Sequence, residues 1–195
     1  MLGSGGVPVA SRFKFEPSDI VVVGILGAIS GVFFPGLNII WLSLVATAGW
    51  PTYIAAVLIP IFKFPGPLAY FLRRKPGINA ITTLVQGVAT VAGGSPFGIL
   101  TFGWIIPQAL IAEAFFAATR YRNFRWGLFA LSGSVMQINE VWTMILFGIP
   151  LTVFLPFLAI AMIFGAVWVP VLSYNLGGAI LRSGLVRTPE TYVLR

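Results

Sequence analysis

Long apolar blocks separated by short basic clusters run through most of the chain. No charged residue occurs from Ile20 to Phe62, and further uncharged blocks cover 76–112, 126–139 and 141–181. A helix needs about 20 apolar residues to cross the hydrocarbon core of a bilayer. Apolar residues here are continuous and do not alternate with polar ones, which argues against membrane-spanning strands. The pattern therefore predicts an all-α integral membrane protein.

Proline and glycine divide the long blocks into separate helices. The breaks fall at Pro35-Gly36, Gly49-Trp50-Pro51, 93–96 and 148–150. They predict six transmembrane helices. The expected spans are 18–42, 51–72, 77–94, 97–120, 126–148 and 152–182.

The stretch 36–50 is compatible with a helix, a re-entrant segment or a loop. We find no convincing internal repeat and no second domain. The chain is expected to form one six-helix transmembrane domain at 18–187, between a flexible leader, 1–17, and a C-terminal tail, 188–195.

Basic residues precede the first expected span and follow the second, fourth and sixth, and the other connections carry no charge. These residues are Arg12, Lys14, Arg73, Arg74, Lys75, Arg120, Arg122, Arg125, Arg182, Arg187 and Arg195. Basic clusters mark the cytoplasmic side of a membrane protein. An even number of spans places all of them on that side, so both termini are expected to be cytoplasmic in a multi-pass protein of the cell membrane.

Composition agrees with a lipid environment. The chain of 195 residues is 58% hydrophobic, has 12 basic and 5 acidic residues, and lacks both histidine and cysteine. Disulfides, zinc sites, iron–sulfur clusters and Cys/His catalysis are thereby excluded. The net charge of +7 reflects membrane topology and does not indicate a nucleic-acid partner. No phosphate-binding loop or nucleophile elbow occurs, so neither an enzyme nor a cofactor is expected.

Charged residues within the expected spans are candidates for function, because a charge in hydrocarbon normally faces a cavity or a partner. Glu140 lies in the fifth span with Gln137 and Asn139 beside it, which makes the most polar patch within any span. Two interpretations stay open and overlap. The patch lines a pocket for a polar or cationic ligand, or Glu140 forms a structural pair with Lys63 of the second span.

Aromatic and amide side chains add further candidates. Trp104 and Gln108 lie on one stripe of the fourth span, while Asn38 and Trp41 lie near the outer face. Such groups can hold a planar ring. Interfacial tryptophans and a glutamine bonded to a neighbouring helix would give the same pattern.

Small residues on the first span form two interleaved pairs, Gly24/Ala28 and Gly27/Gly31. A face of this kind lets another helix approach closely. The partner helix belongs either to the same chain or to another subunit.

A set of motifs, in their order and spacing, resembles a known family. They are Lys75-Pro76-Gly77, Gly94-Ser95-Pro96-Phe97-Gly98-Ile99-Leu100, Gln108-Ala109-Leu110-Ile111-Ala112-Glu113, Arg120-Tyr121-Arg122 and the stretch 176–185. The chain resembles the substrate-binding S component of energy-coupling-factor (ECF) transporters, in the thiamine/hydroxymethylpyrimidine branch of the YkoE type.

The resemblance implies a membrane subunit that binds a vitamin such as thiamine from outside and hydrolyses nothing. It would dock on a transmembrane T component driven by two ATPases, through small residues such as Gly24 and Ala28. Thr83 stands where the family often has a carboxylate, and Glu140 is a candidate substitute. Two other classes remain open: a structural subunit that binds no small molecule, and a stand-alone carrier.

Overall fold

A computed structural model of the chain describes residues 14–48 and 53–186, and all regular elements in these ranges are helices. The elements are α1 (Pro17–Ala48), α2 (Tyr53–Leu58), η2 (Ile59–Lys63), α3 (Pro65–Arg73), α4 (Ile78–Ala92), η3 (Gly98–Thr101), α5 (Phe102–Ala118), α6 (Trp126–Val135), η4 (Met136–Glu140), α7 (Val141–Phe147) and α8 (Leu151–Arg182), where η marks a 3₁₀ segment. Most of the expected leader, the break at 49–51 and the expected tail lie outside the described residues.

Six helical segments correspond to the six expected spans. Four of them are long and apolar enough to cross a membrane: Pro17–Thr47, Tyr53–Arg73, Gly98–Ala118 and Leu151–Arg182. The third expected span is the shorter α4, of 15 residues. The fifth is α6, η4 and α7 in succession, where a 3₁₀ segment interrupts the α-helix. Within the described ranges the predicted all-helical membrane bundle is confirmed.

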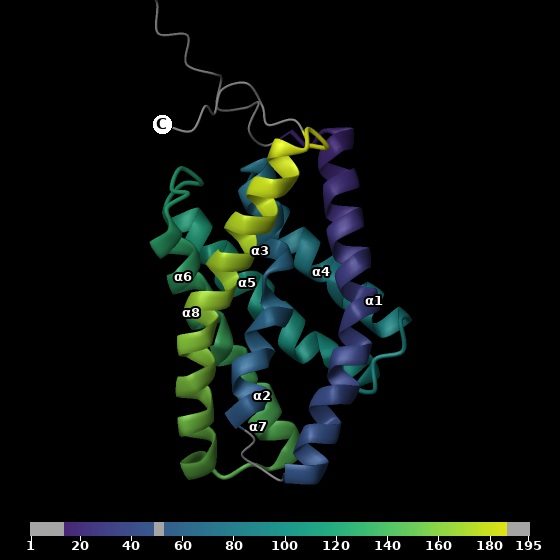
Figure 1. The fold of residues 1–195 in the computed structure, drawn as a ribbon, viewed down its shortest axis with the longest axis vertical. Coiled ribbons are helices and arrows are strands. Elements are labelled where there is room, and N and C mark those ends of the chain that lie inside the picture. Colours follow the sequence, from purple (N-terminus) through teal and green to yellow (C-terminus); the bar gives the residue numbers. More distant parts are fainter. Residues whose placement is uncertain (1–13, 49–52, 187–195) are drawn as a thin grey trace, which may run out of the picture.

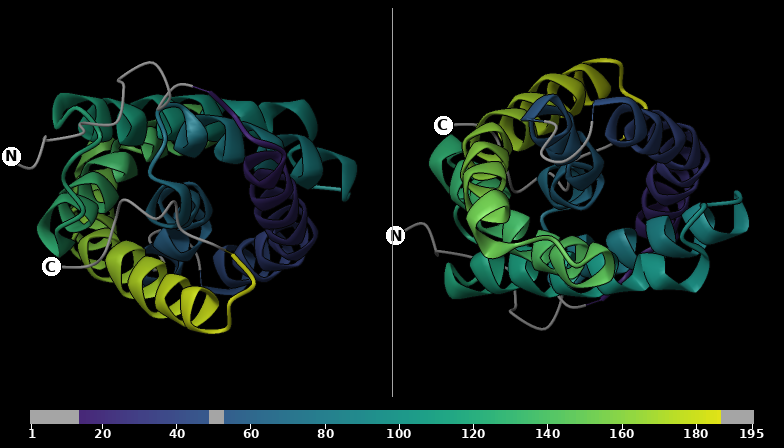
Figure 2. Two further views of the ribbon diagram at one scale, coloured as in Figure 1. Left: turned by 90° about the horizontal axis from the view of Figure 1, so that it is seen from above. Right: turned by 90° about the horizontal axis from the view of Figure 1, so that it is seen from below.

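The helix α3 forms the centre of the bundle. Seen from either end, the α2–α3 segment lies inside a ring made by the other helices (Figure 2). All nine residues of α3 are buried. The long helices α1 and α8 flank this centre, and α1 begins at the same end of the bundle where α8 finishes (Figure 1). This arrangement agrees with an even number of crossings.

The expected break at Pro35-Gly36 is wrong, because α1 continues to Ala48. Proline removes one backbone hydrogen bond, but transmembrane helices tolerate it where neighbouring helices provide compensating contacts. Here α1 packs along α4. An added Cβ at Gly93, just after α4, would lie 3.1 Å from the Gly31 carbonyl oxygen and 3.3 Å from the Pro35 ring. Close packing against α4 is therefore compatible with a single continuous α1 helix.

Stacked aromatic rings fill the interior at the end where α1 begins. Tyr70 of α3 stacks on Phe116 of α5, with ring centroids 4.0 Å apart, and on Phe124, at 5.1 Å. Phe129 of α6 packs against both Tyr70 and Phe116. Such pairs stabilise a core beyond the area that they bury.

A buried ion cluster ties α1 to the α3–α4 turn at this end. The Asp19 carboxylate, which is fully buried, accepts hydrogen bonds from Arg73 Nε at 2.5 Å and Lys75 Nζ at 2.7 Å. Arg74, between them, lies over the Phe124 ring at 4.3 Å. The 73–75 cluster therefore contributes to packing.

We expect Asp19→Asn to lower the stability of the protein markedly. Removing one member of a buried ion pair leaves its partners without their buried counter-charge, which costs about 3–5 kcal/mol. Thermal unfolding in detergent measures this change. Glu16→Gln is the matched control, because Glu16 contacts the same two basic residues with a side chain that is 57% exposed. Equal shifts in Tm for the two variants would contradict the assigned role of Asp19.

Candidate ligand-binding cavity

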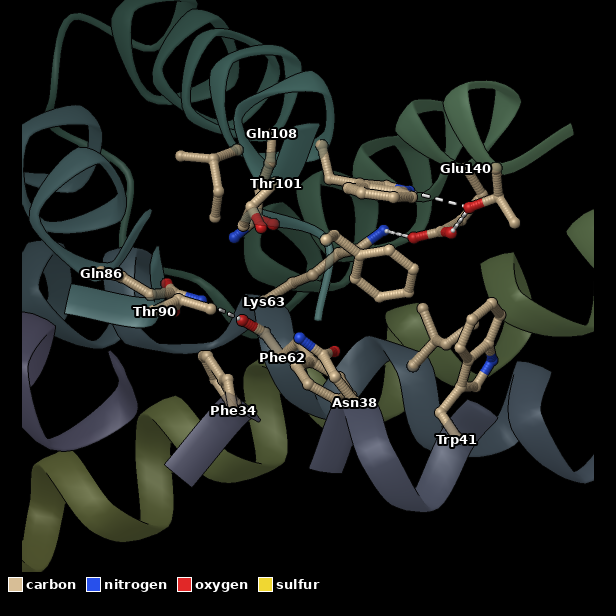
Figure 3. A pocket seen from close by; sticks show the side chains of 15 residues that line it. Phe34, Asn38, Trp41, Phe62, Lys63, Gln86, Thr90, Thr101, Gln108 and Glu140 are labelled. Carbon is tan, nitrogen blue, oxygen red and sulfur yellow. Dashed lines mark hydrogen bonds and ion pairs between the residues drawn. The ribbon is translucent and has the colours of Figure 1, made fainter. Parts of the chain in front are cut away.

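A cavity of about 90 Å³ lies between α1, η2, α4, α5 and the η4–α7 segment (Figure 3). One water molecule needs about 10–15 Å³ of such space, so the cavity has room for several waters or one small ring. Its walls combine aromatic rings with a few polar side chains. The lining residues are Phe34, Asn38, Trp41, Ile59, Phe62, Lys63, Gln86, Thr90, Phe97, Thr101, Trp104, Ile105, Gln108, Glu140 and Thr143.

Most of the binding residues expected from the sequence meet in this cavity. Six of the eight line it: Asn38, Trp41, Lys63, Trp104, Gln108 and Glu140. They come from four segments that are far apart in the chain. The fold thus brings together the polar patch of the fifth span and the aromatic groups of the first and fourth spans.

An ion pair forms one part of the cavity wall. Lys63 Nζ lies 2.8 Å from Glu140 Oε1, and the two side chains are only 3% and 5% exposed. Thr143 donates to Glu140 Oε2 at 2.8 Å, and Trp104 Nε1 donates to the Thr143 hydroxyl at 2.8 Å. The Lys63–Glu140 pair expected from the sequence therefore forms, and both residues line a cavity.

Local irregularity places both charged residues. Lys63 ends the 3₁₀ segment η2, which contains Pro60 and is followed by Pro65 at the start of α3. Glu140 ends the 3₁₀ segment η4. Proline disrupts α-helical hydrogen bonding, and 3₁₀ segments inside a longer helix often mark functional positions. The ion pair therefore joins the two interruptions at the cavity wall.

Two expected binding residues support the wall and do not line it. Asn139 accepts a hydrogen bond from Lys63 and donates to the Trp104 carbonyl at 2.9 Å. Gln137 is fully buried and donates to the Gly133 carbonyl at 2.9 Å. Its amide lies against Gly165 of α8, where an added Cβ would be 2.7 Å away. Asn139 therefore holds the ion pair in place, while Gln137 belongs to the α6–α8 contact.

Sequence reasoning missed two polar lining residues, Gln86 and Thr90. Both lie in α4, one helical turn apart, and are 1% and 3% exposed. A glutamine within the third expected span, with a threonine four residues later, is the signal that was available.

Glu113 has an intramolecular role. Its carboxylate accepts hydrogen bonds from the backbone N–H of Gly77 at 2.6 Å and of Ala80 at 3.1 Å, at the start of α4. The Tyr121 hydroxyl donates to it at 2.8 Å. Burial, and then the neighbouring carboxylate, raise the pKa of Tyr121. Glu113 of α5 thus caps the first turn of α4.

The small residues of α1 divide between two faces. Gly27 and Gly31 are buried against α4, where an added Cβ would clash with Val85 and Ala89. Gly24 and Ala28 are exposed, and an added Cβ at Gly24 would meet open space. Only the Gly24/Ala28 pair is therefore available to a helix outside the described bundle.

These features define a multi-pass membrane protein with a small cavity enclosed by its helices. Residues 18–139 match the model of a family described as "ABC-type cobalt transport system, permease component". Because the match covers more than half of the chain, the protein belongs to this family. A comparison with curated proteins gave no match.

The fold is that of a solved structure described as "Crystal structure of an S-component of ECF transporter". The two share 20% sequence identity with a TM-score of 0.82, and the alignment covers 88% of each chain. The expected S-component-like bundle is thereby confirmed as a fold.

We expect Lys63→Met and Glu140→Gln to destabilise the protein more as single changes than in combination. Each single change leaves a buried charge, or buried donors, without a partner, at a cost of about 3–5 kcal/mol. The double variant removes both charges together. Thermal unfolding of the four proteins in one detergent gives the coupling. Additive losses would show that the two residues do not stabilise each other.

Proposed function

We propose that the chain is the substrate-binding S component of an ECF-type vitamin uptake transporter, and that its ligand is thiamine or its hydroxymethylpyrimidine precursor. One observation carries the proposal: a bundle with the S-component fold encloses a ring-sized cavity with aromatic walls and a buried ion pair. Binding sites for small organic molecules have this combination of apolar enclosure and few, fixed polar groups.

Aromatic contacts in the wall suit a planar ligand. Phe97 lies between two tryptophans, with ring centroids 6.0 Å from Trp41 and 5.1 Å from Trp104. Phe34 and Phe62 pack at 4.6 Å on another side. Offset and edge contacts of this kind are favourable for a further ring placed among them. A pyrimidine ring has the right shape and size for such a site.

The family description names cobalt, but the donor set of the cavity favours an organic ligand. Transition metals such as Co²⁺ are commonly bound by imidazole or thiolate groups, and the sequence contains neither histidine nor cysteine. Glu140 is the only carboxylate among the lining residues, and it is already paired with Lys63. The described residues include no group of three potential acidic, His or Cys metal ligands.

The proposal assigns partners and orientation as well. The outward pair Gly24/Ala28 would contact a transmembrane T component, which two ATPases drive. The end of the bundle that holds the buried Asp19–Arg73 pair would face the cytoplasm, because basic clusters favour that side. Both termini would then be cytoplasmic in the cell membrane, and the subunit itself would catalyse no reaction.

We expect thiamine or hydroxymethylpyrimidine to quench the tryptophan fluorescence of the purified protein saturably, at nanomolar to low micromolar ligand. Trp41 and Trp104 line the cavity, so a bound ring changes their surroundings. Trp104→Phe should reduce the signal. Trp168→Phe should not, because Trp168 donates to the Val57 carbonyl and does not line the cavity.

Two results would contradict the proposed ligand. A folded protein that responds to neither compound would favour a structural subunit. Saturable binding of Co²⁺ without a response to either compound would favour metal transport, in keeping with the family description.

Equal quenching in the two tryptophan variants would place the ligand outside this cavity.

We expect Ala28→Leu to prevent co-purification with the T component and to leave thiamine affinity unchanged, because Ala28 lies on the exposed face of α1. Gly27→Leu should instead lower the Tm, since its side chain would clash with Val85 of α4. Ile163→Leu, at an exposed position on α8, is the control that should keep both assembly and stability. Normal assembly of the Ala28→Leu protein would exclude this docking face.

A further inference from the structure

Three buried polar atoms on one side of the cavity have no hydrogen-bond partner in the described part of the chain. They are Gln86 Oε1 and Thr90 Oγ1 on α4, and Gln108 Nε2 on α5. The three residues are 1%, 3% and 2% exposed, and all line the cavity. Figure 3 shows them apart from Glu140, with Lys63 between the two groups.

Two other threonines of α4, and the Glu140–Thr143 pair, do not share this property. The hydroxyls of Thr82 and Thr83, on the same helix, donate to the carbonyls four residues earlier at 2.7 and 2.9 Å. At the other side of the cavity, Glu140 and Thr143 bond to each other. A buried polar atom without a partner costs about 1–3 kcal/mol. Three such atoms around one cavity indicate that a ligand completes their hydrogen bonds.

The orientation of the Gln86 amide is fixed. Its Nε2 donates to the Phe62 carbonyl at 2.9 Å, and turning the amide over would bring two oxygens together. Gln86 Oε1 is therefore available only as an acceptor. It requires an N–H or O–H donor from a ligand. The Gln108 Nε2 atom requires an acceptor, and the Thr90 hydroxyl can serve as either.

We infer that Gln86, with Thr90 and Gln108, forms the subsite that determines ligand specificity, and that it binds the edge of a heteroaromatic ring bearing both an N–H donor and a ring-nitrogen acceptor. The amino-substituted edge of a pyrimidine has these two groups. This inference rests on the proposed function and assigns recognition of the ring edge to residues of α4 and α5. The subsite is uncharged, so it selects a hydrogen-bonding pattern and not a charge.

An analogue that exchanges the donor for an acceptor tests this assignment. Oxythiamine has a carbonyl oxygen in place of the thiamine amino group and an N–H in place of the adjacent ring-nitrogen acceptor. Its oxygen would therefore face Gln86 Oε1, and its N–H would face Gln108 Nε2. Sites built around a hydrogen bond discriminate strongly against ligands that lack it. We expect the full-length wild-type protein in detergent to bind thiamine at least about tenfold more tightly than oxythiamine, as measured by calorimetric titration.

The variant Gln86→Met should reduce this preference, while Gln108 should retain part of it. Methionine fills a similar volume without an acceptor oxygen. We expect thiamine affinity to fall about tenfold and oxythiamine affinity to change little, which lowers the ratio about tenfold. Thr82→Val is the matched control: Thr82 is buried on the same helix but does not line the cavity. It should keep the wild-type ratio. Gln86→Asn, whose amide is shorter, replaces Gln86→Met if that protein does not fold.

The outcomes separate this inference from the proposed function. A wild-type ratio near one, or an equal loss of both affinities in Gln86→Met, would overturn the subsite and leave thiamine binding intact. A folded wild-type protein that binds neither compound would overturn the proposed ligand and the subsite with it. A wild-type preference that falls in the Gln86 variant and not in Thr82→Val would support both.

Discussion

A charge inside a bilayer requires a partner, and the Lys63–Glu140 pair shows how this bundle meets that requirement. The two residues lie on different helical segments, each interrupted by a 3₁₀ turn that directs a long side chain inward. Because the chain is irregular at both points, the helices do not close against each other there. The aromatic and amide side chains of α1, α4 and α5 then surround the remaining space. Ion pair, interruptions and cavity thus depend on one another.

The positions of the helices were predictable because bilayer thickness sets the length of an apolar span. The expected spans 97–120 and 152–182 differ from the observed Gly98–Ala118 and Leu151–Arg182 by only a few residues. Pro35 was misread as a break, since its effect on α1 depends on packing against α4. That packing involves residues about sixty positions later and is invisible in a local pattern.

The charged residues of the candidate site were predictable because burying a charge in lipid is costly. Its uncharged polar residues were less predictable. Glu140 and Lys63 stood out because any charge in a span needs an explanation. Gln86 and Thr90 carry no charge, and only the fold shows that their polar atoms face a cavity. Gln137 was expected at the site because it lies close to Glu140 in the sequence. Its side chain packs instead beside Gly165 of α8, which comes 28 residues later in the chain.

The helix α1 takes part in three different environments along one uninterrupted rod. Its first turn is anchored by Asp19, its middle lies on α4, and Asn38 and Trp41 near its far end form part of the cavity wall. A continuous helix transmits displacement along its length. If α1 pivots at its first turn, a displacement near Gly24 therefore becomes larger at Asn38 and Trp41. A force applied to α1 near Gly24 would then widen or narrow the cavity.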